Sequence, residues 1–593
     1  MTTEIRNCQN CKQSFVIDSE DFAFYEKMEV PPPTFCWICR VERRLVYRNE
    51  RTLYRRKSGY TGKEIFSTFP PDMPYVTYES DIWYSDAWDP LSYGRDYDFN
   101  RPFFSQFDEL MKIVPLQARS VISPVNSDYG NNSSGSKNCY LVFNTTNAED
   151  CLYGNGVSFS KDCVDNSHIS KSELCYGNFW LTRCSRAFFS ERCEDCSDIW
   201  FSKDLRGCSN CFGCFNLRNK SYYIWNRPHS KEEYAAWLAK LNTGSFCEFS
   251  KWKGEFAQRT IAYPSKFIEG THNSDVSGNY IFNSKNVKKS FLVRDGENLK
   301  YCQYLQEPPN KDCYDHTTWG VGNAFTYECG QVGDGANNVK FVATSWTNIR
   351  NIEYCYMCHS SSDLFGCVSL RNKQYCVLNK QYTKEKYEEL VRRIKEQMMQ
   401  IPYIDKKGRE YRYGEFFPIE FSPFPYNETA TQDYFRRTKS EVEALGYTWR
   451  DQPTRNYSVT MRTEDIPDSI DEVGDKIIED IIRCAHRGEC NDNCTTAFRI
   501  TPTELSFYRR MKLPLPRLCP NCRTCERLEH RGTFKLWPRQ CTCAGEKSEN
   551  DVYSNTASHF HGAGRCPNEF ETSYSPERKE IVYCESCYNS EVV

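Results

Sequence analysis

The sequence predicts a mainly β protein: a duplicated right-handed parallel β-solenoid with helical caps, flanked by small α+β domains. Three observations predict this class. Cysteines recur every twelve residues from Cys139 to Cys175, Cys-x-x-Cys pairs stand near both ends of the chain, and one stretch of the middle region occurs twice. At 593 residues the chain is too long for one hydrophobic core, so several domains are expected.

Composition points to metal ligands rather than disulfides. The chain has 33 cysteines, and its N-terminus (Met1-Thr2-Thr3-Glu4) lacks the basic and apolar regions of a secretory signal. In a long chain without a signal, paired cysteines indicate reduced thiols that bind metal. No apolar run is long enough to span a bilayer, so we expect a cytoplasmic protein without a membrane partner. A net charge of −3 gives no global attraction to nucleic acid.

The N-terminal domain is predicted from two cysteine pairs. Cys8-x-x-Cys11 and Cys36-x-x-Cys39 offer four thiolates, which suit one tetrahedral zinc ion. Between the pairs, residues 15–17 form a short strand in this prediction. A helix follows, and prolines at 31–33 end it and return the chain to the second pair. This is the layout of a small α+β zinc ribbon.

A second ribbon repeats this layout near the C-terminus. The spacing from Cys494 to Cys519 equals that from Cys11 to Cys36, and Thr501 begins a capping box at the start of a helix. The first pair is irregular, with Cys484 and His486 upstream of it; Cys490 is the preferred fourth ligand, and Cys525 is expected to be a free thiol. The predicted zinc ligands are Cys490, Cys494, Cys519 and Cys522.

A third cluster ends the chain. Cys584-x-x-Cys587 is a clear second pair, and Cys566 stands four residues before Phe570, as Cys11 stands before Phe15. The partner of Cys566 in the first pair is left open between Cys541, Cys543 and His561, and the alternative is that Cys541-x-Cys543 holds both positions of that pair. We therefore expect two to three structural zinc ions. The candidate ligands in this cluster are Cys541, Cys543, Cys566, Cys584 and Cys587.

The first ribbon resembles a known family. The pattern Cys8-Gln-Asn-Cys11…Phe15…Phe24-Tyr25…Pro33…Cys36-Trp-Ile-Cys39-Arg40 is similar to the "probable zinc-ribbon" family of bacterial proteins. The resemblance covers Cys8 to about Arg44 and, with its irregular first pair, Cys490 to about Arg527. The whole chain is similar to large uncharacterised zinc-ribbon proteins of uncultivated bacteria. The resemblance implies structural zinc but no activity.

The middle region predicts the solenoid. Each of the recurring cysteines ends a triplet such as Lys-Asn-Cys or Glu-Asp-Cys, and short β-type runs follow. A strand and turn that repeat at a fixed short period are typical of stacked rungs. The cysteines then occupy one rung position. We interpret them as a buried ladder of small apolar side chains, with metal binding as the alternative.

The solenoid is duplicated in this prediction. Residues 212–220 return as residues 365–373, and each copy continues to a Tyr, an Asn and then a helix. Ser230 and Thr383 are the expected N-caps of these helices, which cover the ends of the two solenoids. The expected domains are 1–45, first ribbon; 46–125, basic helix and aromatic irregular segment; 126–260 and 261–400, solenoids with caps; 401–475, linker with a short helix; 476–530 and 531–593, second and third ribbons.

Basic residues beside the ribbons carry the functional hypothesis. Arginine forks bind phosphate, so a zinc ribbon that holds a basic helix predicts nucleic-acid binding, with RNA as one target. A solvated helix face with intramolecular salt bridges is the alternative. A scaffold for a protein partner, or a polysaccharide-acting β-helix enzyme, are the rival functions. The candidate nucleic-acid contacts are Arg40, Arg43, Arg44, Arg48, Arg51 and Arg55.

No catalytic residue is predicted. The nearest cluster of suitable groups is Asp312, Asp315 and His316, for which a structural role in a turn is expected. The sequence contains no phosphate-binding loop, dinucleotide fingerprint or metalloprotease helix.

Overall fold

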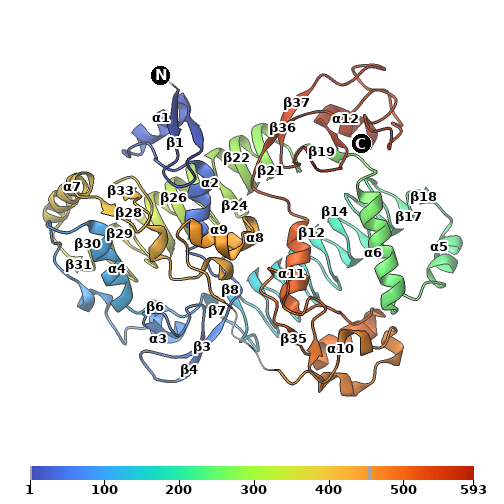
Figure 1. Cartoon of the computed structure of the whole chain (residues 1–593), viewed down its shortest axis with the longest axis horizontal. Coiled ribbons are helices and arrows are strands. Elements are labelled where there is room, and N and C mark those ends of the chain that lie inside the picture. Colours follow the sequence, from blue (N-terminus) through green and yellow to red (C-terminus); the bar gives the residue numbers. More distant parts are fainter. Residues whose placement is uncertain (1–2, 452–456, 593) are drawn as a thin grey trace. The chain divides into compact units, whose positions relative to one another are not determined.

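The computed structural model describes residues 3–451 and 457–592, and it confirms a mainly β chain with 31% strand, 23% helix and about 21 solenoid turns. The chain divides into two compact units (Figure 1). Unit 1 combines Met1–Ser120 with Ile268–Arg450, and unit 2 combines Val121–Phe267 with Asp451–Val593. Each unit therefore contains one solenoid and at least one cysteine-rich ribbon.

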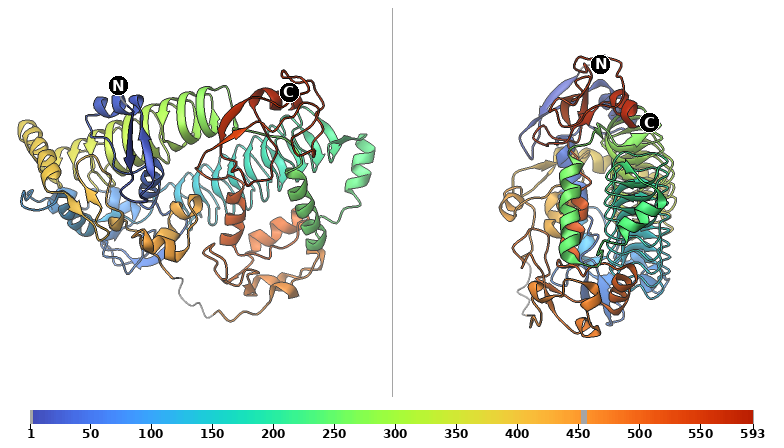
Figure 2. Two further views of the ribbon diagram at one scale, coloured as in Figure 1. Left: turned by 45° about the horizontal axis from the view of Figure 1, so that its top comes forward. Right: turned by 90° about the vertical axis from the view of Figure 1, so that its right-hand side faces the viewer.

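The solenoid of unit 2 is built from rungs of twelve residues. Its strands pair in parallel, with Ser167 opposite Phe179 and Ile169 opposite Leu181. Figure 2 shows the rungs stacked along the solenoid. Its strands are β7 (Val121–Ile122), β8 (Asn131–Ser134), β9 (Phe143–Thr146), β10 (Asn155–Ser158), β11 (Ser167–Ser170), β12 (Phe179–Thr182), β13 (Ser185–Phe188), β14 (Glu191–Glu194), β15 (Ser197–Trp200), β16 (Ser209–Phe212), β17 (Ser221–Ile224) and β18 (Arg227–Pro228).

A left-handed residue at every third position bends each rung. Asn138, Leu141, Asn144 and Asn147 all have φ between 50 and 53°, and the pattern then continues with Asp150. Asn and Asp tolerate this conformation better than other non-glycine residues, which explains why they fill the sequence between the strands. A rung of twelve residues therefore has four bends, and its interior is narrow.

The residue after each bend points inward. Cys139, Val142, Thr145, Ala148 and Cys151 follow one another at intervals of three, and all are buried. Only small or slender side chains fit the narrow interior, so the solenoid cysteines pack with Val, Ala, Ile and Leu. The interpretation as a buried apolar ladder is confirmed.

The solenoid of unit 1 has longer and less regular rungs. Leu299 lies opposite Cys313, fourteen residues later, and Thr326 opposite Val339, thirteen residues later. These insertions hide the twelve-residue period in the sequence. Its strands are β20 (Gly270–Thr271), β21 (Ser274–Phe282), β22 (Lys285–Arg294), β23 (Gly296–Lys300), β24 (Gln303–Leu305), β25 (Asn310–Thr317), β26 (Asn323–Gly333), β27 (Asn337–Trp346), β28 (Arg350–Glu353), β29 (Ser362–Phe365), β30 (Gln374–Val377) and β31 (Lys380–Gln381).

Both solenoids end in the same way, which confirms the duplication. The side chains of Asn226 and Asn379 each bond both backbone groups of a residue in the preceding rung, Phe215 and Val368. The chain then turns into an antiparallel hairpin and a helix that packs on the last parallel strand. These helices are α5 (Lys231–Leu238), capped by Ser230, and α7 (Lys384–Gln400), capped by Thr383, as predicted.

The segment expected as a basic helix and an aromatic irregular region is more ordered than predicted. The helix ends at Leu45, and Arg55 lies in the hairpin of β3 (Tyr54–Lys57) and β4 (Glu64–Ser67). The aromatic residues after it pack on the unit 1 solenoid; the ring of Phe103, for example, lies 5.2 Å from that of Tyr354. Further elements here are β5 (Thr77–Tyr78), α3 (Ser80–Tyr84), η1 (Pro90–Tyr93), α4 (Phe103–Ile113) and β6 (Leu116–Gln117).

The remaining elements connect the solenoids and ribbons. Among the described helices, none has the length and apolar character needed to span a bilayer. Outside the ribbons, unit 1 adds β32 (Tyr403–Ile404), β33 (Glu410–Tyr411), η2 (Ile419–Phe421), η3 (Tyr426–Glu428), α8 (Ala430–Tyr434) and α9 (Lys439–Ala444), and unit 2 adds α6 (Phe246–Thr260), β19 (Ser265–Lys266), η4 (Thr463–Asp465), η5 (Ile470–Glu472) and η6 (Asp475–Ile478).

Candidate metal centres

All three ribbons share one frame. A two-stranded antiparallel hairpin comes first, and a helix begins at the second cysteine pair. The first cysteine directly follows the first hairpin strand, where its backbone N–H donates across the hairpin: Cys8 to Gln13, Cys484 to Thr496 and Cys541 to Asn568, at 2.8–2.9 Å. The elements are β1 (Glu4–Asn7), β2 (Ser14–Ile17), α1 (Ser19–Lys27) and α2 (Trp37–Leu45); β34 (Ile482–Arg483), β35 (Ala497–Phe498), α10 (Pro502–Met511) and α11 (Pro520–Glu529); and β36 (Trp537–Gln540), β37 (Glu569–Thr572), β38 (Val582–Tyr583) and α12 (Glu585–Val592).

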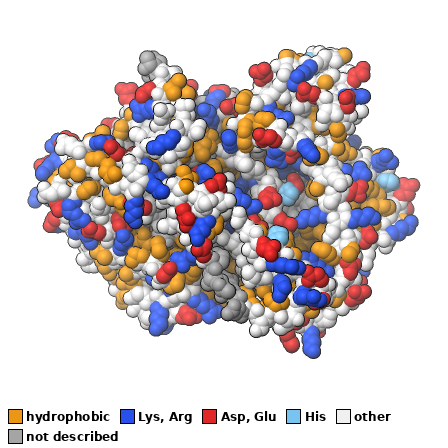
Figure 3. All heavy atoms as spheres, in the orientation of Figure 1, with side chains coloured by type: hydrophobic (Ala, Val, Ile, Leu, Met, Phe, Trp, Pro, Cys, Tyr) orange, Lys and Arg blue, Asp and Glu red, His pale blue; other side chains and the backbone are white. Residues whose placement is uncertain are grey.

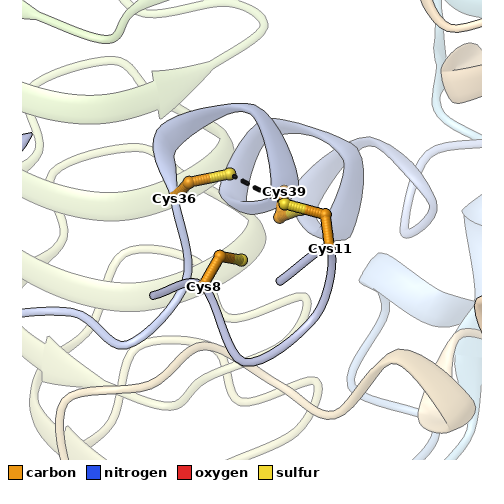
Figure 4. Close-up of side chains that lie close together, drawn as sticks. All are labelled: Cys8, Cys11, Cys36 and Cys39. Atoms are coloured by element: carbon orange, nitrogen blue, oxygen red, sulfur yellow. Dashed lines mark hydrogen bonds between the residues drawn. The ribbon is translucent and has the colours of Figure 1, made fainter. Parts of the chain in front are cut away.

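In the first ribbon the four predicted ligands come together. The Sγ atoms of Cys8, Cys11, Cys36 and Cys39 all lie within 4.8 Å of one another, and Figure 4 shows them converging from the hairpin loop and the start of α2. Cys11 Sγ and Cys36 Sγ are 3.7 Å apart. Four thiolates around a tetrahedral zinc ion, with Zn–S bonds near 2.3 Å, stand about 3.8 Å from one another. The donor set and its dimensions fit such an ion.

In the second ribbon one predicted ligand is replaced. Cys494, Cys519 and Cys522 cluster as expected, but the fourth thiol is Cys484, not Cys490. Cys484 directly follows β34, as Cys8 follows β1, and its Sγ accepts a bond of 3.2 Å from the backbone N–H of Cys519. The loop between Cys484 and Cys494 is longer than the short spacing that the prediction assumed. The prediction missed that Cys484 stands directly after the first hairpin strand, the position that Cys8 has in the first ribbon.

The third ribbon resolves the open choice. Cys541 completes a buried set with Cys566, Cys584 and Cys587, and Cys566 Sγ lies 3.9 Å from Cys584 Sγ and 3.7 Å from Cys587 Sγ. The backbone N–H of Cys584 donates to Cys541 Sγ at 3.2 Å, as that of Cys519 does to Cys484. Cys543 does not belong to this set.

Neighbouring thiols in each set share protons, so the pKa of one thiol falls while that of its partner rises. A hydrogen bond with Cys39 lowers the pKa of Cys11 to about 7, and one with Cys494 lowers the pKa of Cys484 to about 7. A hydrogen bond with Cys541 lowers the pKa of Cys584 to about 4. The same bonds raise the pKa values of the partners Cys39, Cys494 and Cys541, so each bond pairs one thiolate with one thiol, and a bound metal ion would take the place of the shared proton.

The arginines of α2 face the solenoid of unit 1 instead of solvent. The Arg40 guanidinium lies 2.7 Å from the Asp315 carboxylate, and Arg43 and Arg44 contact Glu328 at 2.8 and 2.7 Å. These five side chains are at most 2% exposed. Arg43 also pairs with the Glu415 carboxylate at 2.8 Å. The predicted basic face is therefore an internal docking surface.

The second ribbon docks on the solenoid of unit 2 in the same way. Arg523 and Arg527 of α11 contact the two oxygens of Asp165 at 2.5 and 2.9 Å, and all three side chains are buried. Arg523 also lies 3.3 Å from Glu504 on α10. Glu504 accepts a bond of 2.8 Å from the hydroxyl of Tyr153 on the solenoid. Both ribbons thus bring buried arginines to a solenoid aspartate.

The other candidate nucleic-acid contacts are mostly enclosed as well. Arg48 is buried and pairs with Glu50, and Arg51 is 18% exposed and pairs with Asp433. Only Arg55, 64% exposed beside Glu64, lies on the surface. The prediction of an exposed row of phosphate-binding arginines is corrected, because burial and carboxylate pairing remove five of its six members from solvent. On the face drawn in Figure 3, basic and acidic side chains are interspersed.

The cluster at Asp312, Asp315 and His316 lies on β25 and not in an ordinary turn. Asp315 and His316 are completely buried, and Asp315 is used by the docking arginines. His316 bonds the hydroxyl of Thr326 and the carbonyl of Val332, at 2.7 and 2.9 Å, and burial lowers its pKa to about 4. Asp315 and His316 therefore support the fold and are closed to a substrate.

Comparisons with known proteins leave the family undecided. No family model and no curated protein matches the sequence, so the zinc-ribbon resemblance stays a prediction. Among solved structures, a putative acetyltransferase from Desulfovibrio desulfuricans G20 matches 49% of this chain and 85% of its own, at 9% identity and a TM-score of 0.10. A likeness of this degree carries no argument about function.

Proposed function

We propose that this protein is a zinc-dependent binding scaffold, in which structural zinc ions hold the ribbons and two of the ribbons clamp onto solenoids. One observation carries the proposal. In ribbons 1 and 2, the second pair of the four-cysteine cluster stands at the start of the helix whose arginines enter the solenoid surface. An ion at the cluster would fix the position and direction of that helix.

The chemistry of the donors favours zinc. Four thiolates in tetrahedral array suit Zn²⁺, and iron is the main competitor at such a site. Small ribbons bury too little apolar surface to fold alone, so the ion would supply part of their folding free energy. The buried pairs would then align only while the ion is bound.

A protein partner fits the remaining surface better than nucleic acid does. The arginines that suggested phosphate binding are used inside the molecule. The hypothesis of a polysaccharide-acting enzyme is also weakened, because Asp315 and His316, its candidate catalytic residues, are buried. A solenoid held rigid by its clamps offers a long surface for another protein.

The test combines metal analysis with a binding assay. Full-length protein purified without added metal should contain zinc, and any nucleic acid that copurifies is scored on the same sample. RNA binding should be weak, and its salt dependence should be unchanged in Arg55→Ala, the variant of the exposed arginine. Protein without zinc, or with iron in its place, would overturn the zinc proposal. Tight binding of RNA that weakens in Arg55→Ala would favour the nucleic-acid reader instead.

A further inference from the structure

The third ribbon holds more soft ligands than one ion uses. Besides its four-cysteine set, the ligand atoms of Cys543, His559, His561 and Cys587 lie within 4.8 Å of one another. Cys543 and Cys587 are completely buried. Cys587 belongs to both sets, so a thiolate there stands between two possible ion positions.

The two histidines are oriented as metal ligands are. Nε2 of His559 lies 3.0 Å from the carboxylate of Glu591, so this nitrogen carries the proton and Nδ1 keeps its lone pair. The His559 side chain is completely buried, and its Nδ1 has no hydrogen-bond partner among the described residues. An unpaired polar atom in the interior costs free energy unless something binds it.

His561 mirrors this arrangement. Its Nδ1 lies 2.9 Å from the carbonyl of Gly564, which leaves Nε2 with the lone pair, and Nε2 is 3.4 Å from Cys587 Sγ. Ligand histidines characteristically donate their other N–H to a carboxylate or a backbone carbonyl, which fixes the tautomer and the ring. His559 and His561 each have one such partner.

The surroundings hold these ligands in place. Glu591 accepts bonds from the backbone N–H groups of Thr556 and Ala557, at 2.8 and 3.1 Å, and this fixes the start of the loop that carries both histidines. Cys543 Sγ accepts a bond of 3.3 Å from the side-chain amide of Asn555. This bond holds the Cys543 side chain in the orientation that brings its Sγ atom to the two histidines.

The extra ligands come from an insertion into the ribbon frame. The equivalent pairs of cysteines enclose two residues in the first ribbon (Cys8 to Cys11), nine in the second and 24 in the third (Cys541 to Cys566). Cys543, His559 and His561 all lie inside the longest of these loops. A loop of this length with little regular structure needs internal anchors, and a metal ion is one.

We propose that the third ribbon binds two thiophilic divalent ions bridged by the Cys587 thiolate. One ion takes Cys541, Cys566 and Cys584 as its other ligands, and the second takes Cys543, His559 Nδ1 and His561 Nε2. The proposal rests on the proposed zinc binding and extends it to a dinuclear centre. Two divalent ions nearly balance the five thiolates of the combined set.

The second ribbon has only a partial counterpart. His486, Cys490 and Asp492 gather around Cys522 there, but all three are partly exposed. His486 Nδ1 lies 3.6 Å from Asp492 Oδ2, so no hydrogen bond to that carboxylate fixes this imidazole as one fixes His559. We confine the proposal to the third ribbon, and the test compares variants of that ribbon alone.

The test measures metal per chain in full-length protein loaded with Zn²⁺ and freed of excess ion. The variant His559→Ala/His561→Ala should lose one equivalent relative to wild type, and Cys541→Ser should lose another. The exposed His229, in the same unit but outside both sets, supplies the control, so His229→Ala should lose none. His561→Cys should retain the ion, because a thiolate replaces the imidazole, and this separates ligand loss from misfolding.

Cadmium reports the bridge directly. Protein loaded with ¹¹³Cd should give two resonances for this ribbon, one in an all-sulfur and one in a mixed sulfur–nitrogen environment, coupled through the shared thiolate. Full metal content in His559→Ala/His561→Ala, or two uncoupled signals, overturns the proposal. One ion in each ribbon would leave the zinc scaffold intact and reject only the dinuclear centre. A chain without metal in any ribbon would reject both.

Discussion

The first and second ribbons dock on different solenoids through equivalent residues. Arg40 and Arg523 stand four residues after the first cysteine of the second pair, and Arg44 and Arg527 stand eight residues after it. Asp315 and Asp165 are the solenoid acceptors. The guanidinium carbon of Arg40 lies 5.1 Å from the ring centre of Tyr301, and that of Arg523 lies 4.6 Å from the ring centre of Tyr153. The Nε of Arg44 donates to the hydroxyl of Thr317 at 3.0 Å, and the Nε of Arg527 donates to the hydroxyl of Ser167 at 3.3 Å.

The match teaches that the repeated element is larger than the solenoid. The duplicated element includes the ribbon and its docking site. The order of the segments along the chain hides this duplication, because each ribbon docks on a solenoid that is not next to it in the sequence. The ribbon at the N-terminus docks on the later solenoid, and the ribbon near the C-terminus docks on the earlier one. In the third ribbon Tyr588 stands at the position of Arg40, and its hydroxyl bonds the side chain of Asn216 at 3.2 Å.

Metal removal should give the largest difference between ribbon and solenoid. A structural zinc ion contributes on the order of 10 kcal/mol to the folding of a small zinc domain. We expect a strong chelator to make residues 3–45 and 476–592 sensitive to protease, while both solenoids stay resistant. Mass spectrometry of the fragments checks this. Resistant ribbons after complete metal removal would contradict a structural role for the ion.

Loss of one docking arginine should be the next largest effect. Arg40→Ala and Arg523→Ala each remove one of the two arginines that pair with a buried aspartate, which should cost up to about 3–5 kcal/mol, the cost of breaking a buried ion pair. The two variants should lose similar amounts of stability in urea unfolding. Arg55→Ala removes an exposed pair and should change stability by less than about 1 kcal/mol. A large effect at one ribbon and none at the other would show that the docking sites are not equivalent.

Acid should distinguish the two solenoids. Burial lowers the pKa of His316 to about 4, whereas Asn166 occupies the equivalent position in the other solenoid. Burial also lowers the pKa of His359, in the same solenoid, to about 3. Below pH 6.5 the unfolded chain binds protons at both histidines and the folded chain does not, so unit 1 loses stability as the pH falls from 6.5 toward 4, by about 3 kcal/mol from His316 alone.

The variant His316→Asn gives the solenoid of unit 1 the asparagine that the solenoid of unit 2 has at this position. Its urea midpoint should change less than that of wild type between pH 7.0 and 5.5, a range that limits acid release of metal. An unchanged pH slope would mean that His316 is not the titrating group.

Replacing a solenoid cysteine should have the smallest effect on stability, and alkylation should clearly distinguish solenoid cysteines from ribbon cysteines. Cys151, inside a solenoid, should resist alkylation with or without chelator, because it is completely buried. Cys36 and Cys39 should react only after metal removal. Cys151→Ala should leave the metal content unchanged and cost about 1 kcal/mol, since it removes one small buried group. Alkylation of Cys151 in the native protein would contradict the packed interior.

The elements with a local signal were predictable. The twelve-residue period gave the solenoid, and the four Cys-x-x-Cys pairs gave eight of the twelve cysteines in the three four-cysteine sets. The spacing shared between the ribbons gave Cys494 and Cys566, and Cys541 was among several candidates. A period of three, with a small residue after each bend, was present in the same stretch and would have given the shape of the rung. The replacement of Cys490 by Cys484 was recoverable from the hairpin, because both Cys8 and Cys484 directly follow its first strand.

The sequence alone determined which segments fold as ribbons and rungs, because thiol spacing, bend residues and caps act over a few residues. Only the tertiary structure decided what the arginines do. Arg40 and Asp315 are 275 residues apart, and nothing near either one indicates the other. Whether a charged side chain is buried depends on which surface packs against it, and the solenoid surface that buries these arginines exists only after the rungs have stacked. The same holds for the paired ligand sets of the third ribbon, which a 24-residue loop brings together.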